Sequence, residues 1–284
     1  MIIITGATGT LGRLVVDEAL KVFPASEIGV SVRNATKAQD LSDKGIRVRE
    51  ADFKNPKSLL HAFEGADQIL VISSNSQGDN GNEMIEDHRN VIEAARKVGV
   101  KRLLYTSQIG SSPNSKFYPM IANYGTEELL EQSGLNFISL RNGFYSVTGQ
   151  HFLLSGLKDG ELRLPKDGPV NWTTHEDMAE GTVKILQDLD FKEKYPLLTS
   201  SRALTMEEIA KEFTNEDIKR VIITDEEFSE SMDPNLPEPV KQLFIDIFKA
   251  SCDGDFNKTS PLLEELLGRE TNDIVSILKN QANK

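Results

Sequence analysis

Short apolar runs alternate with amphipathic stretches through the first half of the chain. Runs rich in β-branched residues predict strands at 1–4, 28–32, 46–51, 68–74, 102–108 and 136–143. Between them, apolar positions at helical spacing predict helices at 11–22, 35–42, 55–64, 83–98 and 118–132. Six strands that alternate with helices predict a parallel, right-handed, doubly wound α/β sheet, and they leave the order of its strands open.

The pattern becomes less regular after Gly143. A helix is predicted at 174–188, where Thr174 and Asp177 make a variant of the capping box. A strand at 195–200, a helix at 204–213 and a strand at 220–225 follow, and the remainder is mostly helical. We therefore expect a doubly wound domain at 1–146 and a smaller α/β lobe at 147–284, which lies over the carboxyl edge of the sheet and can add strands to it.

Three glycines follow the first predicted strand at a spacing of three, in the segment MIIITGATGTLG. In a phosphate cradle the first allows a tight turn, the second leaves no side chain between backbone and pyrophosphate, and the third lets the next helix pack closely. Taken alone, this spacing fits an ordinary strand-to-helix turn equally well. Within the βα pattern it predicts that residues 1–146 form a Rossmann domain, which holds a dinucleotide at this glycine turn and at the N-terminus of the next helix.

The second predicted strand ends at Arg33, with Lys37 within a turn of it, where an NAD-specific site carries a carboxylate. A guanidinium binds a 2′-phosphate in a bidentate way and stacks on adenine. We therefore expect NADP(H) in preference to NAD(H), while both cations also fit solvated charges beside a turn. Asp52, after the third strand, is placed either to accept a hydrogen bond from the adenine amino group or to cap the next helix.

Composition restricts the other classes of function. The net charge of −12 argues against a general nucleic-acid footprint. The single cysteine, Cys252, excludes an internal disulfide, and the four histidines lack metal-ligand spacing, so we expect no metal site. No run approaches the roughly 18 to 20 apolar residues of a membrane span, and the N-terminus shows no leader, so a cytoplasmic protein without a membrane partner is expected.

Several segments together resemble one family. TGATGTLG, VRNATKA, ADF, HRNVIEAARKVGVKRLLYTS and LRNGFYS are similar to the NmrA-like branch of the atypical short-chain dehydrogenases. Within it, the chain resembles most the bacterial NAD(P)H:quinone oxidoreductases of the second type and the triphenylmethane dye reductases. The similarity is firm over residues 1–146 and looser beyond.

The resemblance implies that the pyrophosphate is held by Gly6, Ala7, Thr8, Gly9, Thr10 and Leu11. It also implies roles for further residues at the ends of the later strands. The ribose and nicotinamide would be lined by Ser73, Ser74, Asn75, Thr106 and Ser107. The floor beside the nicotinamide and the substrate ring would be formed by Arg141, Asn142, Gly143, Phe144 and Tyr145. The same cluster also fits a sheet edge that holds the second lobe.

The catalytic dyad of ordinary short-chain dehydrogenases, Tyr-x-x-x-Lys, is absent. Tyr124 is followed four residues later by Glu128, a carboxylate that would raise the pKa of the phenol. Two functions therefore remain open. In either case we expect a monomer or a homodimer. The first is an NADPH-dependent reductase of a small quinone-like acceptor, with Phe144, Tyr145 and Trp172 as a stacking platform and water or Tyr124 as proton donor. The second is an NADP(H)-binding redox sensor that acts as a partner of another protein and does little or no catalysis. Whichever function holds, Trp172 also fits a packing residue between the lobes.

Overall fold

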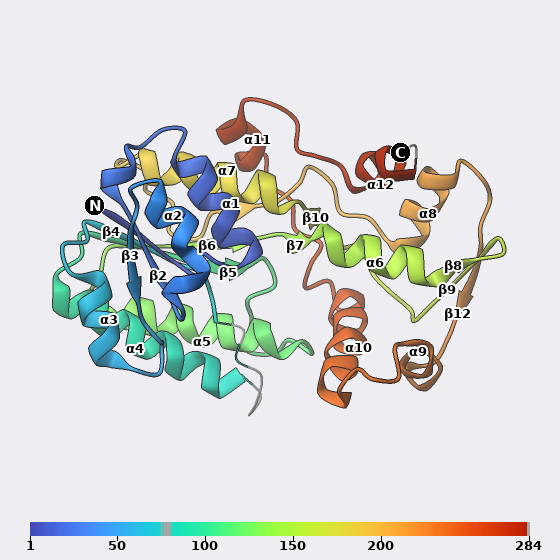
Figure 1. Cartoon of the computed structure of the whole chain (residues 1–284). Helices are drawn as coiled ribbons and strands as arrows, with labels where there is room; N and C mark the ends of the chain where they lie inside the picture. Colours follow the sequence, from blue (N-terminus) through green and yellow to red (C-terminus); the bar gives the residue numbers. More distant parts are fainter. Residues whose placement is uncertain (75, 77–80, 283–284) are drawn as a thin grey trace. The chain divides into compact units, whose positions relative to one another are not determined.

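The computed structural model describes residues 1–74, 76 and 81–282, and the chain divides into two compact units (Figure 1). The first unit comprises Met1–Pro113, Tyr118–Asn142 and His175–Pro196, and the second comprises Asn114–Phe117, Gly143–Thr174 and the chain from Leu197 onward. These limits differ from the boundary expected at residue 146, because the chain passes between the units more than once. In particular, the helix expected in the C-terminal lobe at 174–188 packs on the first helix of the chain.

The first unit contains six parallel strands in the order β6-β5-β4-β1-β2-β3. Their bounds are β1 (Ile2–Thr5), β2 (Ile28–Val32), β3 (Arg47–Glu50), β4 (Gln68–Val71), β5 (Arg102–Gln108) and β6 (Phe137–Asn142). Strand order reverses between β1 and β4, so this is the switch point at which open α/β sheets bind ligands. The predicted fold class is confirmed.

Helices cover both faces of this sheet (Figure 1). Contacts join α1 to α7, and they join α3 to α4 and α4 to α5. The helices are α1 (Thr10–Ala19), α2 (Gln39–Asp43), α3 (Pro56–Phe63), α4 (Asn82–Val98), α5 (Tyr118–Ser133) and α7 (His175–Gln187), and the 3-10 turns are η1 (Ala25–Glu27) and η2 (Ala35–Ala38). The single helix expected at 35–42 is therefore two short pieces, η2 and α2.

Continuous burial explains why the strands are so apolar. All four residues of β1 and of β4 are buried, as required of a parallel sheet covered on both faces. Side chains from β1, β4 and β5 pack with α3 and α4 in one core that includes Ile3, Phe63, Ile69, Val91 and Tyr105. The core fixes the strand ends from which the candidate site is built.

The second unit contains shorter elements. They are β7 (Phe144–Tyr145), α6 (Ser146–Gly156), β8 (Leu157–Lys158), β9 (Glu161–Leu164), β10 (Trp172–Thr173), β11 (Leu197–Leu198), α8 (Met206–Thr214), β12 (Lys219–Ile222), α9 (Asp225–Ser231), α10 (Glu238–Cys252), α11 (Leu262–Leu267) and α12 (Ile274–Ala282). β12, β9 and β8 form one small sheet, and β10 pairs with β7. The helix predicted at 204–213 is confirmed as α8, whereas α6, β8 and β9 carried too weak a pattern to be predicted.

In the part of the chain that the structure describes, no helix combines the length and the apolar character needed to cross a membrane.

Candidate functional site

The turn after β1 has the geometry of a phosphate cradle. Gly6 adopts a φ of +63°, and its carbonyl accepts a hydrogen bond of 2.9 Å from the N–H of Gly9. A Cβ at Gly12 would lie 2.3 Å from the Gly6 oxygen, so only glycine lets α1 approach the turn this closely. A Cβ at Gly9 would meet only the Gly6 oxygen, at 3.4 Å. The backbone at Gly9 is therefore open to a ligand.

The N-terminus of α1 adds to this opening. Gly9 is its N-cap and supplies no side chain to cap the N–H groups of the first turn. Thr8, Gly9 and Thr10 are exposed, while Ala7 and Leu11 are buried and anchor the turn. Unsatisfied N–H groups at the positive end of a helix bind anions, so this turn can hold a pyrophosphate.

Hydroxyl groups tie the end of β4 to its neighbours. Thr5 Oγ1 accepts the Ile72 N–H at 2.9 Å, and Thr106 Oγ1 accepts the Ser73 N–H at 2.9 Å. The structure thus brings together Ser73 and Thr106, which were both predicted site residues. The Thr106 hydroxyl accepts a hydrogen bond from the backbone of Ser73. Asn75, the other predicted residue here, lies outside the described residues.

A buried histidine holds the next residue. The N–H of Ser74 donates to His88 Nε2 at 2.8 Å, which leaves the proton on Nδ1 to be donated to Thr126 Oγ1, also at 2.8 Å. His88 is 1% exposed, and burial lowers its pKa to about 3. The imidazole is therefore neutral and acts as a fixed acceptor for the loop after β4. Ser74 Oγ in turn donates to Asp87.

The cations predicted to select the nucleotide lie at the surface. Arg33 follows β2 and Lys37 lies in η2, and both are exposed. Neither makes an ion pair with any residue that the structure describes. Asp52 does not cap α3, because Asn55 takes that position and accepts from the N–H groups of Lys57 and Ser58. The Asp52 carboxylate accepts the N–H of Lys54 at 2.9 Å and is exposed.

Glu127 engages two of the side chains predicted to contact the cofactor. Its carboxylate is 4% exposed and accepts from Ser107 Oγ at 2.8 Å and from Arg141 Nη2 at 2.7 Å. Ser111 and Ser139 also donate to it. Ser107 and Arg141 therefore hold β5, β6 and α5 together through this carboxylate. The sequence pattern offered no signal for Glu127, because its partners come from two strands, β5 and β6, and from the loop after β5.

Two amides at the ends of β5 and β6 have side-chain atoms without a hydrogen-bond partner among the described residues. Gln108 and Asn142 are opposite each other in the parallel register. Both side-chain atoms of Asn142, which is 1% exposed, and the Oε1 of Gln108 have no hydrogen bond among the described residues. A buried polar atom without a partner costs roughly 1–3 kcal/mol, so such atoms mark a place for a polar ligand or water. Asn142 was predicted, whereas Gln108 was missed.

The aromatic residues after β6 belong to the second unit. Phe144 is 5% exposed and packs at 4.9 Å from the Phe256 ring and 5.7 Å from Trp172. Trp172 is 3% exposed, and its indole N–H donates to the Leu204 carbonyl at 3.3 Å. Both rings therefore have packing roles, which leaves the partly exposed Tyr145 as the most accessible member of the predicted platform.

Gly143 is also constrained by the second unit. A Cβ there would lie 2.1 Å from Thr173 Oγ1, so this position has no room for a larger residue. Its N–H donates to the Leu198 carbonyl at 2.8 Å. The close approach of Thr173 therefore explains why a glycine stands in the LRNGFYS segment, independently of any ligand.

Tyr124 has the environment expected from its sequence. Its hydrogen bond to Glu128 raises the pKa of the phenol, and the charge of that carboxylate adds to the effect. Tyr118, the other tyrosine at the start of α5, has its pKa raised by burial. Neither tyrosine is therefore activated as in the Tyr-x-x-x-Lys dyad. No cluster of histidine, cysteine or carboxylate side chains within the described ranges is arranged to hold a metal ion.

Comparison with known proteins agrees with this geometry. A family model described as NAD(P)H-binding matches residues 6–188. Quinone oxidoreductase 2 of Escherichia coli is 31% identical over 100% of this chain and 99% of its own length, and an NmrA-like family domain-containing oxidoreductase of Aspergillus flavus is 28% identical over 94% and 90%.

Solved structures extend the comparison. The NADPH complex of the E. coli quinone oxidoreductase QOR2 has a TM-score of 0.89 at 29% identity, with 100% of both chains covered. Citrobacter sp. triphenylmethane reductase with NADP(H) has a TM-score of 0.86 at 30% identity, with 99% and 100% covered.

The strand order, the glycine turn and the open N-terminus of α1 define the first unit as a dinucleotide-binding Rossmann fold. The chain belongs to the NAD(P)H-binding, NmrA-like family, and the resemblance seen in its sequence is confirmed.

Proposed function

We propose that this protein is an NADPH-dependent reductase of a small, conjugated, quinone-like acceptor. The observation that carries the proposal is the glycine turn at the β1–β4 switch point with Arg33 at the end of β2. The reductases to which the chain is similar over its whole length support the choice of acceptor.

The residues present fit a dinucleotide. The backbone at Gly9 is open where a pyrophosphate would approach, and Asn142 offers an amide donor and acceptor that have no partner among the described residues. Arg33 and Lys37 have no ion-pair partner among the described residues and would hold the 2′-phosphate. When bound, the cofactor would supply the hydride.

The chain's own part in the reaction is then positioning. A flat acceptor would stack on Tyr145, which is partly exposed, next to the buried Phe144 in the chain. Because the hydrogen bond to Glu128 keeps the Tyr124 phenol a weak acid, we infer that water supplies the protons to the reduced acceptor.

The test follows the absorbance of NADPH with benzoquinone, menadione or a triphenylmethane dye as acceptor. We expect oxidation with at least one of them. Absence of oxidation with all three, together with tight NADP(H) binding by calorimetry, would refute the reductase and support the redox-sensor alternative.

Cofactor preference is tested with Arg33→Ala. Loss of a charge-assisted phosphate contact should raise the KM for NADPH by about tenfold to a hundredfold and leave that for NADH nearly unchanged. Arg89→Ala is the matched control, because Arg89 is an exposed arginine of α4 that pairs with Glu86. An unchanged ratio of NADPH to NADH affinity in Arg33→Ala would overturn this assignment.

A further inference from the structure

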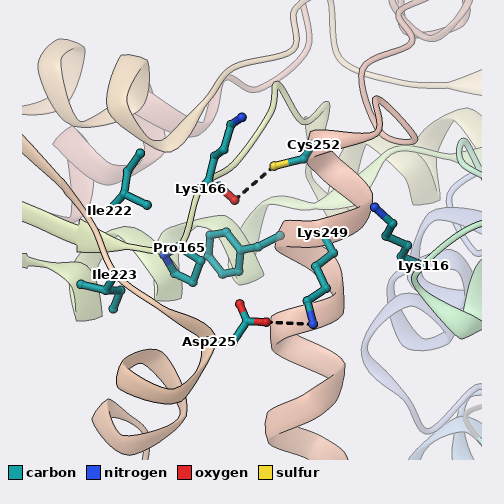
Figure 2. A pocket seen from close by; sticks show the side chains of 9 residues that line it. Lys116, Pro165, Lys166, Ile222, Ile223, Asp225, Lys249 and Cys252 are labelled. Atoms are coloured by element: carbon teal, nitrogen blue, oxygen red, sulfur yellow. Dashed lines mark hydrogen bonds and ion pairs between the residues drawn. The ribbon is translucent and has the colours of Figure 1, made fainter.

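A hollow of about 250 Å³ lies within the second unit (Figure 2). It opens between the segments that follow β9 and β12 and the C-terminal half of α10. Its lining residues are Lys116, Pro165, Lys166, Ile222, Ile223, Asp225, Phe248, Lys249 and Cys252. Neither the family model, which ends at residue 188, nor the proposed reaction uses the α10 wall.

The hollow lies at the carboxyl ends of two parallel strands. β9 and β12 run parallel, with Leu164 opposite Ile222. The segments that follow the two strands leave the sheet at the same edge. Pro165 and Lys166 continue β9, and Ile223 and Asp225 follow β12. The hollow is therefore lined by the two segments that continue from the carboxyl ends of these strands.

One arginine holds the wall in place. The guanidinium of Arg220 donates to the carbonyls of Leu162, Leu164 and Pro165 and to the carboxylate of Asp167. The backbone of Lys166 is therefore fixed between two anchored residues. A largely preformed cavity loses little entropy when it binds a ligand.

The rim of the hollow is cationic although the chain is acidic. The lining holds three lysines and one aspartate, in a protein of net charge −12. Lys249 pairs with Asp225 at 2.8 Å, and Lys116 pairs with Asp253 at 2.8 Å. Lys166 is exposed and forms no ion pair with any of the residues described. Its ammonium is therefore available to an anion.

The wall below the lysines is apolar. Ile222 is 62% exposed, one of few large hydrophobic side chains that face solvent among the described residues. Phe248 and Ile223 are almost fully buried, and together with Pro165 they complete the apolar part of the lining. Covering this wall would remove apolar surface from water, which favours a ligand with a hydrophobic body.

We propose that this hollow binds a small aromatic monocarboxylate, with the ring on Ile222 and Pro165 and the carboxylate on Lys166. A volume of about 250 Å³ is below the usual range for drug-sized ligands, so it suits a single ring. The site is separate from the proposed hydride chemistry, and its occupancy does not depend on the cofactor.

The single cysteine of the chain reports occupancy directly. Cys252 lies on the rim, where its thiol donates to the Lys166 carbonyl at 3.3 Å. Alkylation by neutral iodoacetamide is followed by mass spectrometry, with and without benzoate, at mildly alkaline pH because burial raises the pKa of the thiol. Benzoate should slow alkylation at least about threefold at saturation, and neutral benzamide should not.

Two pairs of variants locate the site. Lys166→Gln should weaken protection by benzoate about fivefold, as expected for one exposed charge pair, whereas Lys192→Gln, an exposed lysine of the first unit, should not. Ile222→Glu places a carboxylate on the apolar wall and should abolish protection. Leu189→Glu is its control, because Leu189 is 70% exposed and lies in the first unit.

Each measurement is the ratio of alkylation rates with and without benzoate, so a direct effect of a variant on the thiol cancels. Absence of protection by benzoate, equal protection by benzamide, or full protection in both Lys166→Gln and Ile222→Glu would overturn the proposal.

Discussion

Single side chains show how the same residue type takes different roles. Arg33 is exposed and unpaired within the described chain, whereas Arg141 is bound to the buried Glu127 and lies 4.8 Å from the centre of the Tyr195 ring. Arg33 was expected to contact the cofactor from its position at the end of the second strand, and Arg141 from the resemblance to the family. The tertiary structure leaves the guanidinium of Arg33 available and engages that of Arg141 in the packing of α5 on the sheet.

Tyr124 gives a test at the residue scale. Because Glu128 raises the pKa of its phenol, we expect Tyr124→Phe to keep quinone reduction within about threefold of the parent rate. Glu128→Gln should lower the pKa of Tyr124, measured from phenolate absorbance during a pH titration in comparison with Tyr124→Phe. A loss of a hundredfold or more in Tyr124→Phe would instead identify this tyrosine as the proton donor.

The βα elements of the first unit follow local rules. Asn55 with Pro56 begins α3, and Gly99 with a φ of +73° ends α4, as their sequences indicate. Strands β2 and β5 have the predicted bounds, because buried parallel strands carry long apolar runs. Short strands such as β8 and β10, with two residues each, have too few positions to show any period.

The glycine turn gives a test at the scale of the element. Gly12→Ala should destabilise the fold by about 2 kcal/mol or more, because its Cβ would lie 2.3 Å from backbone that cannot move aside. Gly9→Ala should leave the melting temperature nearly unchanged, since its Cβ has room, and should weaken NADPH binding at least tenfold. Thermal unfolding and fluorescence titration separate the two effects. Equal loss of stability in both variants would contradict this account.

At the scale of the whole molecule, buried ionisable groups link stability to pH. The pKa of His88 is lowered by burial to about 3 from an ordinary value of 6.5, so the unfolded chain binds the proton more readily. The contribution of neutral His88 to the free energy of unfolding is complete above about pH 6.5. Below that pH the free energy of unfolding decreases by at most about 1.4 kcal/mol per pH unit, down to about pH 3. Burial also lowers the pKa of His175, which adds in the same direction.

Urea unfolding at pH 7 and in steps down to about pH 4.5 measures this dependence. Asp67 does not titrate in this range, because its hydrogen bonds to Lys101 and to the N-terminus lower its pKa to about 2. We expect a smaller loss of unfolding free energy with acid in His88→Gln than in the parent, and an unchanged loss in His151→Gln, where the histidine is exposed. Equal pH dependence in the parent and His88→Gln would show that His88 does not carry the effect.

The sequence by itself determined the class of the fold and the glycine turn, and it predicts the nucleotide-selecting position, because each depends on a few consecutive residues or on a short period. Only the tertiary structure decided the strand order, the division into two units, and the roles of His88, Glu127 and Gln108. Their partners lie on other elements, and burial sets both the charge state and the free hydrogen-bonding capacity of a side chain. Neither the separation in sequence nor the residue type shows such contacts before the chain is packed.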